Sequence, residues 1–328
     1  MTAIITSIDD IKAFVPVNVN LKFNSVSPYF DNVLRDKLIF PWLGTEIIED
    51  LEDNLGSNDE VYQNLEKKTQ AVIAYFSILE AMPFLEVQFG DEGIHRVESD
   101  YSKSAYQGQI KRIQSSLATS GYSAIEDLLN YLNENVDEYA VWTTAPGYTE
   151  SKRYIFKNSL DFHNYYNLQL RAQTYTILVQ PMRYINQFVI GKAIGTAAFK
   201  NFIDIKNEVN GVNTNAKKLE AIELLKNATA YLTVAKALRE NWVALSANGI
   251  HFKMSTTETV WTENQATAEQ LSQKIKELQN TGEDYLQALI SLMNNNLDDF
   301  PEFNNDNTVN KPSAEDNILG GVEKTWVS

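Results

Sequence analysis

Residues 93–95 read Gly-Ile-His, and they follow the pair Ala74-Tyr75 at an interval of eighteen positions. The same pattern returns in the second half of the chain, where Gly249-Ile250-His251 follows Ala230-Tyr231 at the same interval. Both matches occur at a single shift of 156 residues. Two separated matches at one shift indicate an internal repeat, and a repeat of this length predicts two copies of one structural module.

Other parts of the two halves align in the same order. The further pairs are 26–28 (VSP) with 179–181 (VQP), 43–45 (LGT) with 194–196 (IGT), and 128–135 (LLNYLNEN) with 289–296 (LISLMNNN). The shift drifts from 151 to 161 along the chain, as small loop insertions would produce. The repeat therefore organises most of the sequence.

Apolar residues fall at helical spacing in each copy, which predicts a mostly α fold. In the first copy, a helical stripe from Phe30 to Leu38 leads into a predicted turn at residues 40–44, where proline and glycine interrupt the helix. Thr45 is then expected to cap the next helix, and the acidic run over residues 46–60 reads as a solvated helix face rather than a cation site. The longest helix of the copy follows.

A loop or short hairpin and two shorter helices are expected to complete each copy. Helical spacing disappears around residues 90–106 and 246–261, where Thr, Ser, Tyr and Val accumulate. It returns over 108–117 and 122–135 in the first copy, and over 264–280 and 283–296 in the second. The sequence thus predicts a tandem duplication of a helical-bundle module with short hairpin or loop insertions.

The chain is expected to divide into a first module over residues 1–140, a second over 141–296, and an extended C-terminal arm over 297–328. The arm has no periodicity and finds no match in the first copy. Its apolar residues are predicted to dock on a neighbouring subunit or another protein, although a merely floppy terminus is an alternative. These residues are Phe300, Phe303, Ile318, Leu319, Val322 and Trp326.

Charge divides the chain unequally. The net charge is -15, yet residues 1–140 hold 23 acids and 10 bases whereas residues 151–296 hold 12 acids and 16 bases. An acidic surface repels phosphates, which disfavours sequence-specific DNA binding but suits a wall past which DNA slides. The acidic half of one subunit is a candidate to face the basic half of the next, and two independently solvated halves are the alternative.

Several function classes find no support in the sequence. The chain has no cysteine, which excludes disulfides and thiolate chemistry and suits a reducing cytoplasm. No apolar stretch is long enough to span a membrane, and the N-terminus does not read as a secretory signal. We therefore expect no membrane association.

Few residues could carry catalysis or hold a metal. Glu92 and His95 have metal-ligand spacing, but Asn248 replaces the glutamate in the second copy, so we favour a structural role for His95 and His251. His163 lies among aromatic residues and is read as a packing or interface residue. The segment 191–196 lacks the order of a phosphate-binding loop and is read as a turn. We expect no enzyme activity, cofactor or metal.

The N-terminal third resembles a specific group of proteins. Residues 8–17 (IDDIKAFVPV), the segment 23–38 after an Asn-rich loop, and Pro41-Trp42-Leu43-Gly44 resemble an uncharacterised family of Bacteroidota phages and prophages. That family is similar in architecture to the head-to-tail connector (adaptor) proteins of tailed phages. The resemblance spans mainly the first copy, and ordinary adaptors hold one bundle whereas this chain holds two.

The resemblance implies a structural virion protein. Twelve copies would form a ring below the portal protein, extend the DNA channel, and join tail or neck proteins, with DNA only as passing cargo. The location would be the neck of the virion, assembled in the cytoplasm of the bacterial host. Two alternatives stay open: another neck or tail-completion protein, and a cellular helical-repeat module that binds proteins.

Overall fold

A computed structural model describes residues 4–17, 21–85, 87–90, 93–96, 106–168, 171–207, 215–241, 243–246, 249–252 and 268–303. The chain forms two compact units that divide between Ser151 and Lys152. The first unit thus extends beyond the expected limit at residue 140, because the segments η4 (Ala140–Thr144) and α6 (Pro146–Ser151) pack against its helices. Each unit has its own hydrophobic core.

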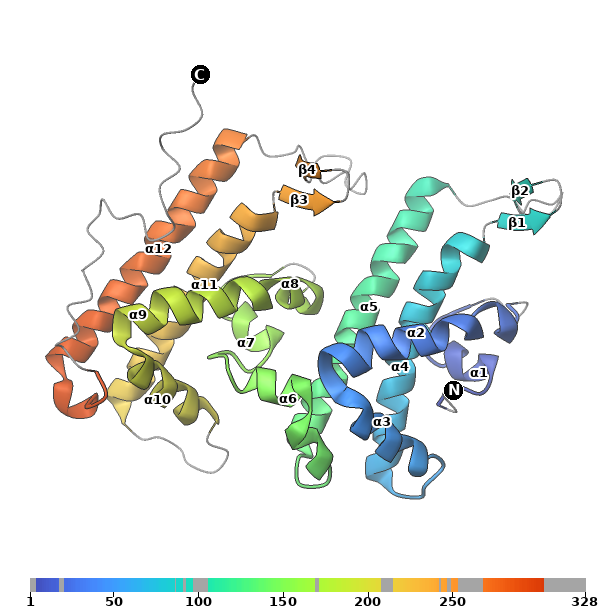
Figure 1. The fold of residues 1–328 in the computed structure, drawn as a ribbon, viewed down its shortest axis with the longest axis horizontal. Helices are drawn as coiled ribbons and strands as arrows, with labels where there is room; N and C mark the ends of the chain where they lie inside the picture. Colours follow the sequence, from blue (N-terminus) through green and yellow to red (C-terminus); the bar gives the residue numbers. More distant parts are fainter. Residues whose placement is uncertain are drawn as a thin grey trace. The chain divides into compact units, whose positions relative to one another are not determined.

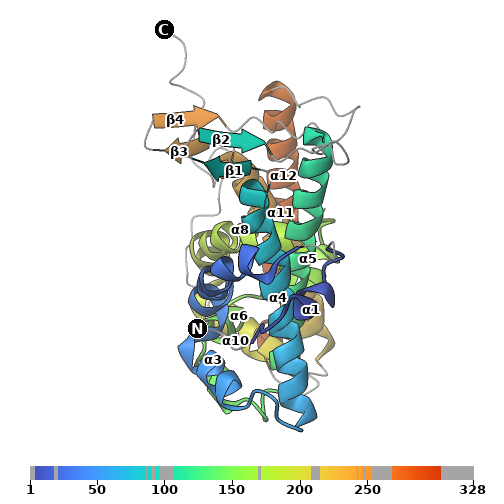
Figure 2. The same cartoon turned by 90° about the vertical axis from the view of Figure 1, so that its right-hand side faces the viewer.

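The first unit is a mostly helical module with one β-hairpin (Figure 1). Its remaining elements are α1 (Ile8–Lys12), η1 (Phe23–Ser25), η2 (Ser27–Tyr29), α2 (Phe30–Val33), η3 (Leu34–Leu43), α3 (Gly44–Asp53), α4 (Glu60–Leu85), β1 (Val87–Gly90), β2 (Gly93–Arg96) and α5 (Gln107–Glu134). The long helices α4 and α5 lie side by side in both views (Figure 1 and Figure 2). Their facing apolar stripes carry much of the core.

The second unit repeats the element order of the first. Its elements are α7 (Ser159–His163), α8 (Arg171–Tyr184), η5 (Ile185–Ile190), α9 (Gly191–Ile194), α10 (Thr196–Asn207), α11 (Ala216–Asn241), β3 (Val243–Ser246), β4 (Gly249–Phe252), α12 (Ala268–Asn295) and η6 (Leu297–Asp299). The paired long helices have equal lengths in the two units, 26 residues for α4 and α11 and 28 for α5 and α12. The predicted tandem duplication of a helical module is confirmed.

The repeat also reaches the N-terminal helices, which sequence alignment left unmatched. Asp10 of α1 accepts a hydrogen bond from the Thr6 N–H at 2.8 Å, and Asp161 of α7 accepts one from the Lys157 N–H at 2.9 Å. Both acceptors stand at the same shift as Gly44 and Gly195. Each carboxylate stands in the first turn of its helix and accepts from the backbone N–H just before the N-cap residue, Ser7 or Asn158, which fixes how the chain enters the helix.

A π-helix occurs at the same place in each unit: η3 precedes α3 in the first unit, and η5 precedes α9 and α10 in the second. In the first unit η3 runs through Pro41 to Leu43, so proline does not interrupt the helix as predicted for residues 40–44, and only the predicted glycine break is confirmed; wide π-type turns continue where a regular α-helix would stop. The chain breaks instead at Gly44, whose φ of 72° and ψ of 176° suit glycine alone. Thr45 is not a cap, because α3 already begins at Gly44. Gly195 repeats the break with φ of 85°.

An antiparallel hairpin joins the long helices in each unit, as the loss of helical spacing predicted. Val87 pairs with Arg96 in the first hairpin and Val243 with Phe252 in the second, so the registers coincide. Most of the predicted loop residues that follow each hairpin lie outside the described residues.

The second long helix of each unit, α5 or α12, is continuous, which corrects the prediction of two shorter helices. α5 passes through Gly121 and α12 through Gly282 without interruption. A Cβ atom at Gly121 would lie 2.7 Å from the Phe76 ring, and one at Gly282 would lie 2.7 Å from Leu232. The glycines therefore let two helices approach closely rather than ending one.

Aromatic side chains from the segment that follows the second long helix complete the core of each unit. In the first unit Tyr139 and Trp142 are buried, and Trp142 Nε1 donates to Asn133 Oδ1 at 3.1 Å. In the second unit Phe300 and Phe303 occupy the corresponding positions and are only 3% and 9% exposed. The segment beyond residue 297 thus continues the second module at least to Phe303, because these side chains fill its core.

Candidate functional site

Charge on one repeated helix differs sharply between the units. Helix α3 of the first unit carries five acids and no base, and Glu46 and Glu49 are exposed. Its counterpart α10 carries Asp204 as its only acid and two lysines, of which Lys200 is exposed at the position equivalent to Glu49. The same structural element is therefore strongly acidic in the first unit and close to neutral in the second.

The second unit also contains a partly buried ionic cluster. Lys226 of α11 forms an ion pair with Asp161 of α7 at 2.8 Å, and the two side chains are only 11% and 17% exposed. The Lys226 ammonium lies 5.3 Å from the centre of the Tyr165 ring, whose hydroxyl donates to Glu223 at 2.8 Å. Burial and this hydrogen bond raise the pKa of Tyr165 above its ordinary value. The cluster ties α7 to α11.

Lys206, near the end of α10, lies close to this cluster. Its ammonium donates to the Tyr154 carbonyl oxygen at 2.7 Å. Burial, with a smaller contribution from the positive charge of Lys152, lowers the pKa of Lys206 to about 7. Burial thus disfavours the charged form of this lysine.

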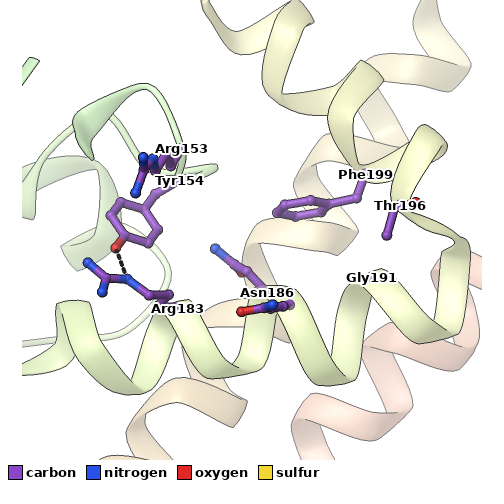
Figure 3. A pocket seen from close by; sticks show the side chains of 8 residues that line it. Arg153, Tyr154, Arg183, Asn186, Gly191, Thr196 and Phe199 are labelled. Carbon is purple, nitrogen blue, oxygen red and sulfur yellow. Dashed lines mark hydrogen bonds between the residues drawn. The ribbon is translucent and has the colours of Figure 1, made fainter. Parts of the chain in front are cut away.

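A pocket of about 330 Å³ opens in the second unit above η5 (Figure 3). Its walls come from the segment before α7, from α8 and η5, and from α9 and α10. The lining residues are Arg153, Tyr154, Arg183, Asn186, Gln187, Gly191, Thr196 and Phe199. Arg183 Nε donates to the Tyr154 hydroxyl at 3.3 Å, which fixes two of the walls relative to each other.

Asn186 is the most unusual residue of this pocket. Its side chain is 5% exposed, and neither its amide nitrogen nor its amide oxygen has a hydrogen-bond partner in the protein. Sequence reasoning passed over Asn186 because it stands in an apolar stretch, Ile185–Ile190. A lone polar residue on the buried side of such a stretch was the available signal.

The three histidines lie at the end of a helix and on the two hairpins. His163 ends α7, and its Nδ1 accepts a hydrogen bond from the Leu168 N–H at 3.0 Å, which secures the turn after the helix. His95 lies on β2 opposite Gln88, and His251 lies on β4 opposite Ala244. Because His95 lies on a β-strand, the helical spacing that a metal-ligating Glu-x-x-His pattern requires does not apply; Glu92 lies outside the described residues. Among the described residues, no group of three or more His, Cys, Asp or Glu side chains could hold a metal ion.

The segment 191–196 is mostly helical, and the turn predicted there is reduced to a break at Gly195. α9 ends at Ile194, and α10 begins at Thr196 after Gly195. No strand precedes this segment, because η5 leads directly into α9.

The predicted arm residues separate into two groups. Phe300 and Phe303 belong to the second core, where the Phe300 ring lies 6.1 Å from that of Phe202. Hydrogen bonds from Asn201 to Glu302 and from Asn215 to Asp299 hold the same segment. Phe300 and Phe303 are therefore packing residues. The other four predicted contacts lie outside the described residues: Ile318, Leu319, Val322 and Trp326.

Large apolar side chains also reach the surface away from the cores. Phe40 on η3 is 68% exposed, and Tyr184 and Phe188 are exposed on the equivalent part of the second unit. Lys236 lies 3.8 Å from the centre of the Tyr184 ring, a cation–π contact that partly covers it. Within the described part of the chain, no helix has the length and apolar character needed to cross a membrane.

Comparison with known proteins gives a family without a function. A model described as a family of unknown function (DUF6712) matches residues 31–152 and again residues 190–313. The double match agrees with the duplication in the fold, and its second part extends past the expected start of the arm at residue 297. No curated protein and no solved structure matches the chain.

Proposed function

Since the chain belongs to DUF6712, a family of unknown function, we propose its role from its own architecture and charge. We propose that it is a non-enzymatic structural protein of a tailed-phage virion and that it assembles as a head-to-tail connector ring. Copies sit below the portal protein, extend the DNA channel and offer a platform to tail or neck proteins. The resemblance of residues 8–17 and 41–44 to phage proteins motivates this choice.

The observation that carries the proposal is the charge difference between α3 and α10. The strongly acidic helix α3 on one module and the exposed Lys192 and Lys200 on the other give each subunit two surfaces that can attract each other. When copy after copy uses the same two surfaces, the contact is heterologous, and such contacts close into rings if the rotation per subunit permits. The pair Glu49 and Lys200 marks the two surfaces at one repeat position.

Binding is the whole activity on this proposal. An acidic wall lets DNA pass without sequence-specific contact, because like charges repel the phosphates. The duplicated module departs from the single bundle of ordinary adaptors. That departure favours a second candidate, another layer of the neck or a tail-completion protein, which would share the ring but not the contact with the portal.

A charge-exchange experiment tests the ring. One variant carries Glu46→Lys and Glu49→Lys on the acidic helix, and the other carries Lys192→Glu and Lys200→Glu on the second unit; all four side chains are exposed. At about 50 mM salt, where charges are weakly screened, we expect the unchanged chain to form rings in mass photometry and electron microscopy. Each variant alone should remain smaller, because two like-charged surfaces then meet.

An equal mixture of the two variants should assemble again, with the variants alternating around the ring. Restoration by mixing is specific to a heterologous contact between the two modules. Particles that never exceed a dimer in the unchanged chain, or variants that assemble alone as well as the unchanged chain does, would contradict the proposal. An unchanged chain that never exceeds a dimer would favour a cellular protein-binding module, which predicts no ring.

A further inference from the structure

Two aromatic rings form an exposed pair on the second unit, which we call the aromatic patch. Tyr184 at the end of α8 and Phe188 on η5 are 38% and 45% exposed, and their ring centres lie 5.1 Å apart. Single exposed apolar side chains are common on protein surfaces, whereas two rings in contact form a continuous apolar surface. The described part of the chain leaves this surface exposed, so its burial by a partner would stabilise a complex.

Two lysines give the aromatic patch a positive charge. The Lys236 ammonium lies 3.8 Å from the centre of the Tyr184 ring and pairs with Glu240 at 2.6 Å. Lys192 is exposed, and its ammonium lies 5.8 Å from the centre of the Phe188 ring. Aromatic rings flanked by cations suit a partner that brings an apolar group and negative charge together.

The first unit presents this combination at Phe40. The Phe40 side chain lies on η3 and is 68% exposed. The chain breaks four residues later at Gly44, and the acidic helix α3 follows, with Glu46 in its first turn and Glu49 also exposed. An apolar ring that is followed at once by a run of carboxylates has the chemistry that suits the aromatic patch.

The duplication places each of these surfaces on one unit only. At the two positions of the aromatic patch, the first unit has the buried Val33 and the charged Lys37. At the position of Phe40, the second unit has the buried Gly191. Each copy of the chain therefore carries one exposed ring and one aromatic patch, which is the arrangement that a heterologous contact requires.

We propose that the aromatic patch binds Phe40 of a second copy of this chain. The Phe40 ring packs on Tyr184 and Phe188, and the carboxylates of α3 approach Lys192. This inference rests on the proposed function, since it names the residues of the contact between neighbouring copies. The same contact would also join copies into a dimer or an open chain, so it does not depend on closure of the ring.

Photo-cross-linking of the full-length chain locates the contact. One variant carries p-benzoylphenylalanine in place of Phe40, which keeps an aromatic ring at this position. After mixing with ¹⁵N-labelled unchanged chain and illumination, we expect mass spectrometry to find cross-links to residues 180–192 of the labelled copy. The same substitution at Tyr106, which is 81% exposed in the same unit, is the matched control and should give no cross-link to that segment.

Serine substitutions measure what the rings contribute. Phe40→Ser and Phe188→Ser should each weaken association at least about tenfold in sedimentation velocity, because truncation of a central aromatic side chain removes much of the affinity of a contact. Both side chains are exposed, so the fold should be retained. Ile177→Ser removes an exposed apolar side chain from α8 outside the aromatic patch and should leave association unchanged.

An equal mixture of Phe40→Ser and Phe188→Ser separates this contact from the ring. The first variant keeps only the aromatic patch and the second keeps only the exposed ring, so the mixture has one usable contact. We expect a heterodimer and nothing larger. Rings of the unchanged chain with cross-links elsewhere would overturn this contact and leave the proposed function standing, whereas open chains joined through Phe40 would do the reverse.

Two further results would assign the aromatic patch to another occupant. Cross-links from p-benzoylphenylalanine in place of Phe188 to residues 304–328 would show that the C-terminal segment covers the patch. Binding of oligo-dT that is lost in Phe188→Ser, without any cross-link between copies, would assign the patch to nucleic acid, since rings flanked by lysines also suit bases and phosphates. Either result, or equal association of Phe40→Ser and the unchanged chain, would overturn the proposal.

Discussion

The two units attach their N-terminal helix to the long central helix by different chemistry. In the first unit Gln70 of α4 donates to the Ile4 carbonyl oxygen at 2.7 Å, and Asp10 meets only local donors. In the second unit Lys226 stands at the position of Gln70 and forms its ion pair with Asp161. The duplicated shape thus survives while a neutral contact in one copy corresponds to a buried ionic contact in the other.

Asp10 shows what the cap contributes without a cation. Partial burial raises the pKa of Asp10, but hydrogen bonds from the Thr6 and Ser7 backbone outweigh it and the pKa lies below its ordinary value. Asp161 has the equivalent cap and a charged partner as well. The second copy has therefore placed more charge in its interior, which makes it more sensitive to the loss of one partner.

The largest expected effect comes from removing one charge of the ionic contact. Asp161→Asn should lower the free energy of unfolding by about 3 kcal/mol, because it leaves the Lys226 ammonium buried without a counter-charge. Asp10→Asn should cost about 1 kcal/mol, the loss of charge-assisted capping bonds alone. Denaturant unfolding measures both values.

A double variant checks the cause. Asp161→Asn combined with Lys226→Met should recover part of the lost stability, since no unpaired charge then remains. Equal losses for Asp10→Asn and Asp161→Asn would show that the two copies differ in appearance but not in energy.

A second pair of variants probes the feature that the copies share. Gly121→Ala and Gly282→Ala should each destabilise their unit by roughly 1–3 kcal/mol, because the added methyl group would lie inside contact distance of the facing helix. Gly282→Ala should cost more, since the Leu232 backbone nitrogen lies 3.1 Å from the new atom and moves less easily than the Phe76 ring.

Gly108 provides the matched control on α5. No atom lies within 4 Å of a Cβ built there, so Gly108→Ala should be neutral or stabilising by up to about 1 kcal/mol through helix propensity. Thermal unfolding distinguishes the three variants. Stabilisation by Gly121→Ala or Gly282→Ala would refute the close approach of the helices.

Sequence reasoning recovered the duplication and the helical class because both depend on residue types in a linear order. It divided α5 and α12 into two shorter helices each. The close packing of Gly121 against Phe76 and of Gly282 against Leu232, which explains why a glycine stands inside each helix, is not visible in the sequence. It also placed Phe300 and Phe303 in an arm, since an Asn- and Asp-rich flank hides residues that fill a core. These errors share one cause: a single sequence does not show which residues pack against each other.

The candidate site was less predictable than the fold. The acidic and basic halves follow directly from composition, and the structure shows that α3 and α10, which differ in charge, are equivalent elements of the repeat. The pocket does not follow, because its walls come from separated segments and Asn186 stands out only once its burial is known.

The smallest expected effect concerns Lys206, whose equivalent in the first unit is the apolar Leu55. Because the pKa of Lys206 is about 7 in the folded chain and about 10.5 when unfolded, the unfolded chain binds more protons between these values. Stability should therefore rise with pH above 7, by at most about 1.4 kcal/mol per pH unit. Below pH 7 the full penalty of burying the ammonium is present.

Lys206→Met should remove this rise and bring the second unit closer to the first. At pH 6 Lys206→Met should also be more stable than the unchanged chain, because no buried ammonium remains. This gain in the free energy of unfolding is reduced by about 1 kcal/mol, because the Tyr154 carbonyl oxygen loses its donor. Urea unfolding between pH 6 and 9 measures the slope in both proteins, and Lys200→Met, which removes an exposed lysine from the same helix, is the control. If the unchanged chain and Lys206→Met show the same slope, then Lys206 is charged and solvated, and the second copy carries its extra charge without energetic consequence.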